Sequence, residues 1–372
     1  MKGLKKFLWF LYKCFVFYTL LVCILIFWNP FSGWLAGFMM MSFPVTMIIH
    51  LVSVPIWFVM ERKKALLPLS MLLIGSIFLP RTYAFNNSNP AQNSPENKAS
   101  FKVVSYNVRS FMRNFTPRDR WVKRQIREMK GWIRDSGADV VCLPEYYEDE
   151  SDLFDISERL RGGGYKYQRF YKRSNERRSQ GQSGLALISK HPIIASKDTI
   201  FEAQNGMIQA DIKMGDDTIR IIGLHLYSMT LQLSNLVHQK EMDGMAREGK
   251  ITFRQMRKGF VRRAGELAVL ESWVRESPYP TVVCGDFNEV PYGYVYGRMK
   301  GLMGNSFEEK GQGFGFTYNH IPYFIRIDHQ FYSKQTLRVT DFTTYSNIKY
   351  SDHYPISGVY EIRRSADTKE ED

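Results

Sequence analysis

The sequence predicts an α/β protein in which packed sheets are flanked by helices, preceded by a helical transmembrane region. Two observations support this. From Phe101 onward, short β-branched runs alternate with a few amphipathic segments at helical spacing, and many strands with few long helices favour a layered sandwich. Before residue 86, long stretches are almost free of charge, which is typical of helices that cross a membrane.

Three apolar stretches lie within residues 1–85. Residues 7–28 are apolar apart from Lys13, residues 34–60 carry no formal charge, and residues 65–83 form a third, shorter stretch. The first two are long enough to cross a bilayer as helices. A cleaved signal peptide is the alternative for the first stretch, but two more apolar stretches follow it without a small-residue cleavage site. We therefore expect retained membrane helices.

The charge of the chain is distributed unevenly. Residues 1–85 hold eight Lys or Arg against one acid, so they account for +7 of the net charge of +13 and leave the remainder only mildly basic. Basic clusters precede the first span and occupy Glu61–Lys64, and both prefer the cytoplasm. Three spans then predict a multi-pass protein of a bacterial inner membrane with its larger part in the periplasm. If the third stretch enters only the membrane interface and does not cross the bilayer, the part of the chain after residue 85 faces the cytosol instead.

The rest of the chain divides by composition. Residues 86–100 are rich in Asn, Ser and Pro and lack large apolar residues, so they predict a flexible tether. A folded domain is expected over 101–362, with a charged tail over 363–372. Within the domain, helices are predicted where apolar residues recur three or four apart, at 121–135 and 260–275. Strands are predicted at 101–106, 139–143, 184–189, 207–214, 218–225, 281–284, 326–332 and 355–360.

Polar side chains stand beside several of these strands, at positions where α/β folds bind ligands. Each has an ordinary alternative, because Asp and Asn commonly form turns and a lone Glu after a strand is usually a surface residue. A fold does not need carboxylates, amides and imidazoles at several separate strand ends, whereas a metal-dependent hydrolase does. The candidates are Asn107, Glu145, His225, Asp286, Asn288, Asp328, Asp352 and His353.

The chemistry of the acidic and amide candidates is complementary. Glu145 and Asp352 are hard oxygen ligands suited to Mg²⁺ or Mn²⁺, which bind few protein carboxylates and keep waters for a substrate phosphate. Asp286 and Asn288 lie two apart on one turn, so one can orient a water molecule while the other donates to an oxyanion. Asn107 offers a neutral amide for a phosphate or a metal-bound group.

The imidazoles supply proton chemistry. Asp328 can fix the tautomer of His353, and His225 ends a strand where it can supply another proton or hydrogen bond. Together, the candidates make up a metal site, a water activator and a proton donor. The residues alone therefore predict metal-assisted hydrolysis, with a phosphoester as the favoured substrate.

Six short stretches make a more specific resemblance. They are, in chain order, Ser105-Tyr106-Asn107, Leu143-Pro144-Glu145, Gly223-Leu224-His225-Leu226, Gly285-Asp286-Phe287-Asn288, Arg326-Ile327-Asp328-His329 and Ser351-Asp352-His353-Tyr354-Pro355. On these stretches, residues 101–362 resemble the endonuclease/exonuclease/phosphatase superfamily, which includes deoxyribonuclease I, abasic-site endonucleases, sphingomyelinases and inositol-polyphosphate 5-phosphatases. Any one stretch is a weak match, whereas six in the order of the family over about 250 residues make a strong one.

The resemblance implies a four-layered α/β sandwich, two packed mixed sheets flanked by helices, with its site at one rim. It implies Glu145 as the principal metal ligand, with Asp352 and Asn107 near the metal, and Mg²⁺ or Mn²⁺ as the cofactor. It also implies that Asp286 activates the attacking water. The phosphate would be contacted by Asn107, Asn288, His225 and His353, the last oriented by Asp328.

Two departures from the family pattern bear on the substrate. Pro144 stands where the family usually has Gln, which removes a donor but leaves the neighbouring carboxylate intact. Val108-Arg109 after Asn107 differs from the continuation typical of abasic-site endonucleases, which also lack a His at the place of His225. Both departures favour the deoxyribonuclease, sphingomyelinase or phosphatase branches.

The sequence leaves two classes of substrate open. One is a nucleic acid, which would make the protein an endonuclease, and the other is a lipid or small-molecule phosphate. A catalytically silent, membrane-tethered binding module is the alternative of a different class. The basic segment Lys250–Arg263 predicts a phosphate-binding lid, a strip lying on anionic lipid, or a solvated helix face. A second basic cluster, Lys172-Arg173 through Arg177-Arg178, lies in a Ser/Asn/Gln-rich loop.

Overall fold

The computed structural model describes most of the chain. Residues 87–99 of the predicted tether, the cluster from Lys172 to Arg178 and residues 364–372 of the predicted tail lie outside the described residues. The described residues are 2–29, 32–86, 100–115, 119–171, 181–202, 204–229, 242–320 and 323–363.

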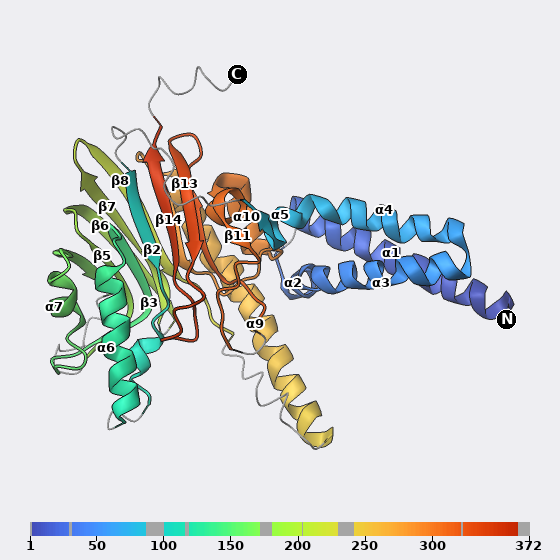
Figure 1. Cartoon of the computed structure of the whole chain (residues 1–372), viewed down its shortest axis with the longest axis horizontal. Coiled ribbons are helices and arrows are strands. Elements are labelled where there is room, and N and C mark those ends of the chain that lie inside the picture. The colour runs from blue at the N-terminus through green and yellow to red at the C-terminus, as the bar shows by residue number, and fades with distance from the viewer. Residues whose placement is uncertain are drawn as a thin grey trace.

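Two six-stranded mixed sheets form the centre of the molecule (Figure 1). Sheet I has the order β10-β12-β9-β8-β7-β6, and sheet II has the order β13-β14-β2-β3-β5-β4. Sheet I comprises β6 (Ile193–Glu202), β7 (Asn205–Met214), β8 (Asp217–His225), β9 (Thr281–Asp286), β10 (Gly304–Asn305) and β12 (Asp328–Tyr332). Sheet II comprises β2 (Ser100–Ser105), β3 (Val140–Glu148), β4 (Tyr167–Phe170), β5 (Gln182–Ser189), β13 (Leu337–Thr344) and β14 (Ile356–Ile362).

Helices cover the outer face of each sheet, so the sandwich has four layers. Helices α6 (Arg120–Asp135) and α7 (Ile156–Arg161) pack on sheet II, where Ile126 and Ile133 join the apolar side chains of β2 and β3. Helices α9 (Met242–Arg275) and α10 (Tyr294–Leu302) pack on sheet I. A third apolar cluster fills the space between the sheets. The predicted sandwich of two mixed sheets flanked by helices is confirmed.

Each predicted strand has a counterpart in the sheets, and both predicted helices exist. The helix predicted at 260–275 is the C-terminal half of α9, which begins at Met242 and includes the basic segment Lys250–Arg263. The edge strands β4, β6 and β13 were missed because their side chains are largely polar or half-buried and lack the buried run of a central strand.

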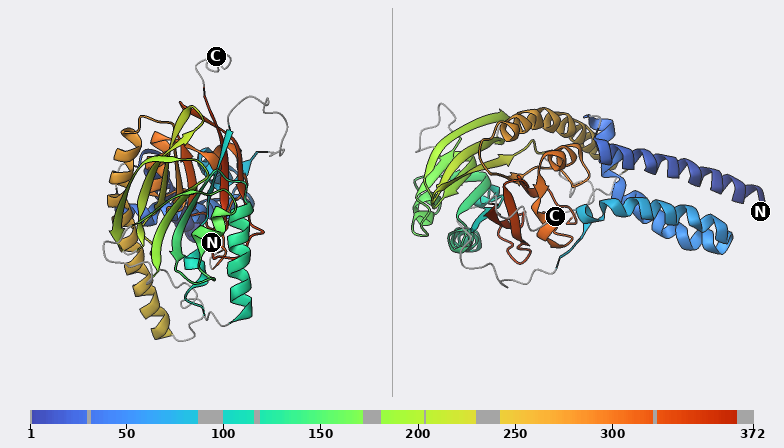
Figure 2. Two further views of the ribbon diagram at one scale, coloured as in Figure 1. Left: turned by 90° about the vertical axis from the view of Figure 1, so that its left-hand side faces the viewer. Right: turned by 90° about the horizontal axis from the view of Figure 1, so that it is seen from above.

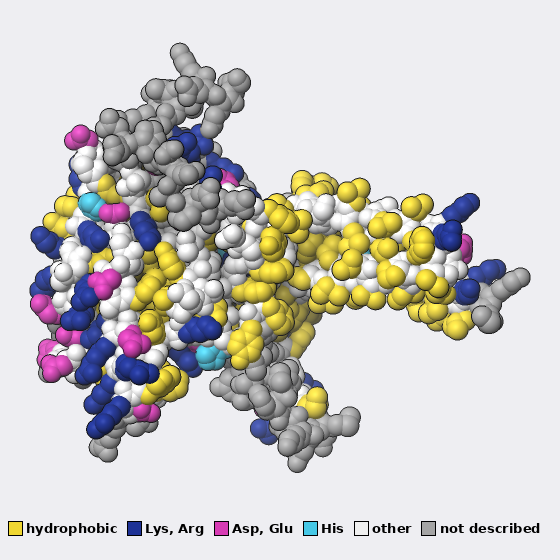
Figure 3. All heavy atoms as spheres, viewed as in Figure 1, with side chains coloured by type: hydrophobic (Ala, Val, Ile, Leu, Met, Phe, Trp, Pro, Cys, Tyr) yellow, Lys and Arg dark blue, Asp and Glu magenta, His cyan; other side chains and the backbone are white. Residues whose placement is uncertain are grey.

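Three helices are long and apolar enough to cross a membrane, at Gly3–Trp28, Trp34–Met60 and Arg62–Thr82. They contain α1 (Lys2–Trp28), α2 (Trp34–Met41), α3 (Phe43–Met60), η1 (Arg62–Ala65), α4 (Leu66–Gly75), η2 (Ser76–Phe78) and α5 (Leu79–Thr82). The bundle extends from one side of the sandwich (Figures 1 and 2). Its surface is covered with apolar side chains, and Lys and Arg gather at the end farthest from the sandwich (Figure 3).

The buried imidazole of His50 has hydrogen-bond partners inside the bundle. Buried His50 of α3 forms hydrogen bonds with the Tyr12 hydroxyl at 2.7 Å and with Thr19 Oγ1 at 3.0 Å, both on α1. Polar contacts of this kind between helices hold their register in an apolar surrounding. We therefore interpret His50 as part of the packing of the bundle.

The helical bundle also packs directly on the sandwich. Tyr292, in the loop before α10, is buried among bundle residues, its ring 4.9 Å from that of Phe43, and it contacts the Thr82 hydroxyl. Gly297 of α10 allows the close approach of Asn29 at the end of α1. Strand β1 (Ala84–Phe85), just after the third apolar helix, pairs with β11 (Gln312–Gly313). The bundle and the sandwich therefore share an apolar interface.

Candidate active site

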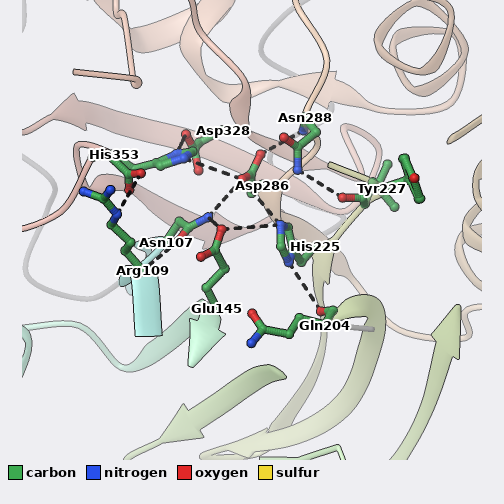
Figure 4. A network of polar contacts seen from close by, with 12 residues as sticks. Asn107, Arg109, Glu145, Gln204, His225, Tyr227, Asp286, Asn288, Asp328 and His353 are labelled. Atoms are coloured by element: carbon green, nitrogen blue, oxygen red, sulfur yellow. Dashed lines mark hydrogen bonds and ion pairs between the residues drawn. The ribbon is translucent and has the colours of Figure 1, made fainter. Parts of the chain in front are cut away.

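The polar side chains predicted at the ends of the strands lie together at one rim of the sandwich. In sheet I, His225 pairs with Asp286 in the β8–β9 register, and Asp328 pairs with Asp286 in the β12–β9 register. Sheet II brings Asn107 from the end of β2 and Glu145 from within β3 to the same rim (Figure 4). Residues far apart in the sequence thus lie side by side because strand order places β8, β9 and β12 together.

Asn107 connects the two sheets. Its side-chain amide is fully buried, and Nδ2 donates to Glu145 Oε1 and to Asp286 Oδ2, both at 3.0 Å. Its Oδ1 accepts a hydrogen bond from the backbone N–H of Arg109 at 3.0 Å. The amide is therefore held in one orientation between a carboxylate of each sheet.

A β-bulge sets the position of Glu145. The β3–β5 register shifts between Pro144 and Tyr146, and Glu145 has φ of +51°, a conformation that costs free energy for a residue with a side chain. The carbonyl of Pro144 accepts a hydrogen bond from Val108 N–H at 3.1 Å, so the proline is accommodated without loss of this contact. The Glu145 side chain remains 31% exposed, which leaves it open to a ligand.

Asp286 is the buried carboxylate at the centre of the site. Burial and the neighbouring Asp328 carboxylate raise the pKa of Asp286 to about 6, although His353 and His225 act in the opposite direction. Its Oδ1 accepts the backbone N–H of Asn288 at 2.8 Å. Asn288 has φ of +50°, and its Nδ2 donates to the carbonyl of Leu226 at 3.0 Å. A carboxylate with a pKa near neutrality is suited to accept a proton from water.

His353 and Asp328 form a hydrogen-bonded pair across the two sheets. His353, in the segment before β14, donates from Nδ1 to Asp328 Oδ2 at 2.8 Å, and its Nε2 lies 3.8 Å from Asp286 Oδ2. Burial lowers the pKa of His353, but the Asp328 and Asp286 carboxylates outweigh it and raise the pKa to about 10. The imidazole is thus a cation at neutral pH, with Nε2 directed toward the site.

His225 has one ring nitrogen without a partner among the described residues. Its Nδ1 donates to the carbonyl of Gln204 at 3.3 Å. The buried Nε2 makes no hydrogen bond, and it lies 3.9 Å from Glu145 Oε1 and 3.8 Å from Asp286 Oδ2. A buried polar atom left unpaired is costly, so this nitrogen points to a group that a ligand supplies.

Two functional candidates were missed at the level of sequence. Arg109 Nε lies 3.3 Å from Asp352 Oδ2, and Arg109 begins a turn, Arg109–Met112, in which every residue has positive φ. The Tyr318 ring lies 5.2 Å from that of His353, and burial together with Asp352 raises the pKa of its hydroxyl to about 12. Neither residue stands directly at the end of a predicted strand, so the strand-end pattern did not mark it.

The donor set fits a hard divalent cation. Glu145 and Asp352 are partly exposed carboxylates, with side chains 31% and 17% exposed, at the same rim as the Asn107 amide. Ligand atoms of Asp286, Asp328 and His353 also lie within 4.8 Å of one another. In that group the imidazole is already hydrogen-bonded to a carboxylate and all three residues are buried, so the open oxygen donors fit Mg²⁺ or Mn²⁺ better.

This fold and site define a metal-dependent phosphoesterase. A model of the endonuclease/exonuclease/phosphatase family matches residues 104–353, and the chain belongs to this family. Members of the family are metal-dependent hydrolases of phosphoester bonds, so the chain is an enzyme of that class. A second model, described as a domain of unknown function, matches residues 5–82. No match was found among curated proteins.

Solved structures of the family have a similar fold at low sequence identity. A family protein from Bacteroides thetaiotaomicron is 18% identical, with a TM-score of 0.49 over 72% of this chain and 100% of that one. The human Nocturnin catalytic domain, solved with bound sulfate, is 16% identical, with a TM-score of 0.48 over 71% and 95%. Danio rerio TDP2, solved with a single-stranded DNA product, is 14% identical, with a TM-score of 0.48 over 70% and 99%.

Proposed function

We propose that this chain is a membrane-anchored phosphoesterase that uses a divalent metal, Mg²⁺ or Mn²⁺, to hydrolyse a phosphodiester or phosphomonoester by attack of water. The observation that carries the proposal is the position of Asn107, whose amide joins the open carboxylate of Glu145 to the buried carboxylate of Asp286. One rim thereby presents oxygen ligands beside a proton acceptor and two imidazoles.

The metal would be held by Glu145 and Asp352, with Asn107 close by, and when bound it would polarise the phosphoryl oxygens of the substrate. Asp286, with its pKa raised to about 6, orients the attacking water and accepts its proton. The fixed amide of Asn288 binds a phosphoryl oxygen.

The two imidazoles act on the charge that develops during the reaction. His353 is held cationic by Asp328 and stabilises negative charge on the phosphate through Nε2. The unpaired Nε2 of His225, when it carries a proton, donates to a second phosphoryl oxygen or to the leaving group. Both imidazoles are oriented by bonds made at Nδ1, so little reorganisation is needed when the substrate binds.

The helical bundle supports a topology with the catalytic domain outside the cytosol, as for a multi-pass protein of a bacterial inner membrane. The turn η1 between α3 and α4 carries Arg62, Lys63 and Lys64, and it lies at the end of the bundle farthest from the sandwich (Figure 1). Lys and Arg side chains gather at this end (Figure 3). Basic residues favour the cytoplasmic side, so the sandwich lies on the opposite side. A reporter that is active only outside the cytosol should be active after Asn97 and inactive within Glu61–Lys64. The reverse pattern would contradict this topology.

A direct assay tests the activity. The full chain, purified in detergent, should hydrolyse bis-p-nitrophenyl phosphate with Mg²⁺ or Mn²⁺ and lose that activity in excess EDTA. Plasmid DNA and phospholipids, offered in parallel, separate an endonuclease from a lipid phosphodiesterase or phosphatase. Inactivity toward all three with either metal would favour the catalytically silent binding module.

A further inference from the structure

The N-terminal half of α9 lies against the helical bundle. Phe253 stacks on Phe38 of α2 with ring centroids 4.9 Å apart and lies 5.8 Å from the ring of Trp34. One helical turn further along, the guanidinium of Arg257 sits 5.3 Å from the Trp34 ring. At the middle of α9, Phe260 also packs on Phe38, with ring centroids 5.3 Å apart. This half of α9 is therefore fixed beside the start of the second apolar helix.

The same stretch carries cations that lack acidic partners. Among the described residues, its ion pairs to Glu202 come from Lys258 at 3.3 Å and Arg262 at 3.8 Å. Lys250, Arg254 and Arg257 are exposed and pair with no described carboxylate. Exposed cations on the side of a domain that faces its own membrane helices are placed to meet anionic headgroups.

These cations lie along one groove rather than around the helix. The residues recur three or four apart, so they share one face of α9. Phe253, 46% exposed, lies between the basic side chains and can enter the interface between headgroups and acyl chains. Trp34, at the beginning of α2, is an aromatic of the kind that anchors helix ends at that depth. The groove is lined by Ala246, Gly249, Lys250, Phe253, Arg254 and Arg257.

The helix that bears this groove also contacts the active site. Lys258 Nζ lies 4.9 Å from the ring of Tyr227, two residues beyond His225. The buried Arg263 donates from Nε to Glu289 at 2.6 Å, directly after Asn288. In Figures 1 and 2, α9 runs along sheet I and projects past the sandwich on the side of the bundle. One helix thus carries both the groove and the contacts to the residues that follow His225 and Asn288.

We infer that the groove on α9, defined by Lys250, Phe253, Arg254 and Arg257, binds anionic phospholipid headgroups in the leaflet next to the catalytic domain. The inference rests on the proposed function in one respect, because it takes the apolar helices as membrane spans. It goes further by assigning the basic segment to the lipid surface. Single-stranded nucleic acid is the alternative ligand for this groove, and the experiment distinguishes it from lipid.

Lipid binding can be measured without reference to catalysis. The full chain, delipidated in detergent, is titrated with phosphatidylglycerol or phosphatidylcholine, and the bound lipid is counted by native mass spectrometry. The wild type should retain more phosphatidylglycerol than phosphatidylcholine. The triple variant Lys250→Gln, Arg254→Gln, Arg257→Gln should bind it on the order of a hundredfold more weakly, since each cation near an anionic surface strengthens binding by roughly fivefold.

A matched control removes the same charge elsewhere. Arg120, Arg124 and Arg127 are exposed on α6, on the side of the sandwich away from the bundle, and their change to Gln should leave lipid binding intact. Hydrolysis of bis-p-nitrophenyl phosphate and the melting temperature should be unchanged in both triple variants. If the proposed catalytic function were wrong, the hydrolysis would be absent while the difference in lipid binding persisted.

Three results would overturn the inference. The first is equal retention of the two lipids by the wild type, and the second is an equal loss of phosphatidylglycerol in both triple variants. The third is that the α9 variant keeps its lipid but loses affinity for a fluorescent single-stranded oligonucleotide, measured by anisotropy. That outcome would assign the groove to nucleic acid.

Discussion

The two sheets contribute differently to the site. Sheet II brings Glu145, and the segment before β14 brings Asp352, and both carboxylates are partly open to solvent. Sheet I brings Asp286 and Asp328, each 1% exposed, and His225, 3% exposed. An open carboxylate can receive a cation from solvent, whereas burial changes the affinity of a carboxylate for protons. The proposed mechanism therefore places metal binding on the open carboxylates, which form the metal side, and proton transfer on the buried groups, which form the proton side.

Two hydrogen bonds join the two halves of the sandwich at the rim. Asn107 of sheet II donates to Asp286 of sheet I at 3.0 Å, and His353, ahead of β14, donates to Asp328 of β12 at 2.8 Å. Each bond therefore holds a side chain of sheet II, or of the segment before β14, at a fixed distance from a carboxylate of sheet I. The variants below separate the two sides by measuring metal affinity and turnover independently.

The largest effect is expected on the metal side. Glu145→Gln preserves shape but removes the charge that holds the cation, so turnover should fall on the order of 10²-fold or more. The apparent metal affinity should fall as well, which a Mn²⁺ titration of activity would show. Full activity of this variant, or of the wild type in excess EDTA, would contradict the metal mechanism.

On the proton side, Asp286→Asn should lower turnover by a similar order, about 10² to 10³, because one preorganised group is removed. His353→Ala should behave in the same way. In a Mn²⁺ titration of the remaining activity, both variants should show the same apparent metal affinity as the wild type. A large shift in metal affinity for Asp286→Asn would mean that the buried group Asp286, Asp328 and His353 holds the cation, and that the two halves are not divided as described.

A pH measurement tests the cross-sheet pair. In the folded, metal-free chain the pKa of His353 is raised to about 10, above its usual value near 6.5, so its imidazolium persists through neutral pH and is lost only as the pH rises toward 10. Asp328→Asn removes a carboxylate that holds this charge and should move the titration of His353 downward. NMR of the imidazole in EDTA would follow it. An unchanged midpoint would show that Asp328 does not hold the proton.

The smallest effect is expected from the contact with the helical bundle. The loop that carries Asn288 continues to Tyr292, which is buried against the bundle. Tyr292→Ala should lower turnover about tenfold by displacing this loop, with metal affinity unchanged. Tyr165, buried on the opposite side under α6 and α7, provides the matched control, and Tyr165→Ala should lower only the melting temperature. Equal turnover in both variants would show that the bundle does not support the site.

Much of the site could be predicted because its residues stand next to recognisable strands. Asp286 follows a run of β-branched side chains, and His225 ends another, so the local pattern of the chain is enough to place both at the rim. Arg109 and Tyr318 could not be found in this way. They lie in segments without periodicity, and the distance from Tyr318 to His353 depends on a single isolated bridge between their backbones.

The sequence by itself determined the apolar helices, the buried strands and the chemical groups available at their ends, because these follow from local composition and periodicity. Only the tertiary structure decided the pKa values and the exposure of those groups. Burial beside Asp328 raises the pKa of Asp286, and a bulge turns Glu145 toward solvent. The packing of α9 on α2 was likewise decided in three dimensions, since contacts between Phe253 and Phe38 depend on how separate elements pack and leave no local pattern in the chain.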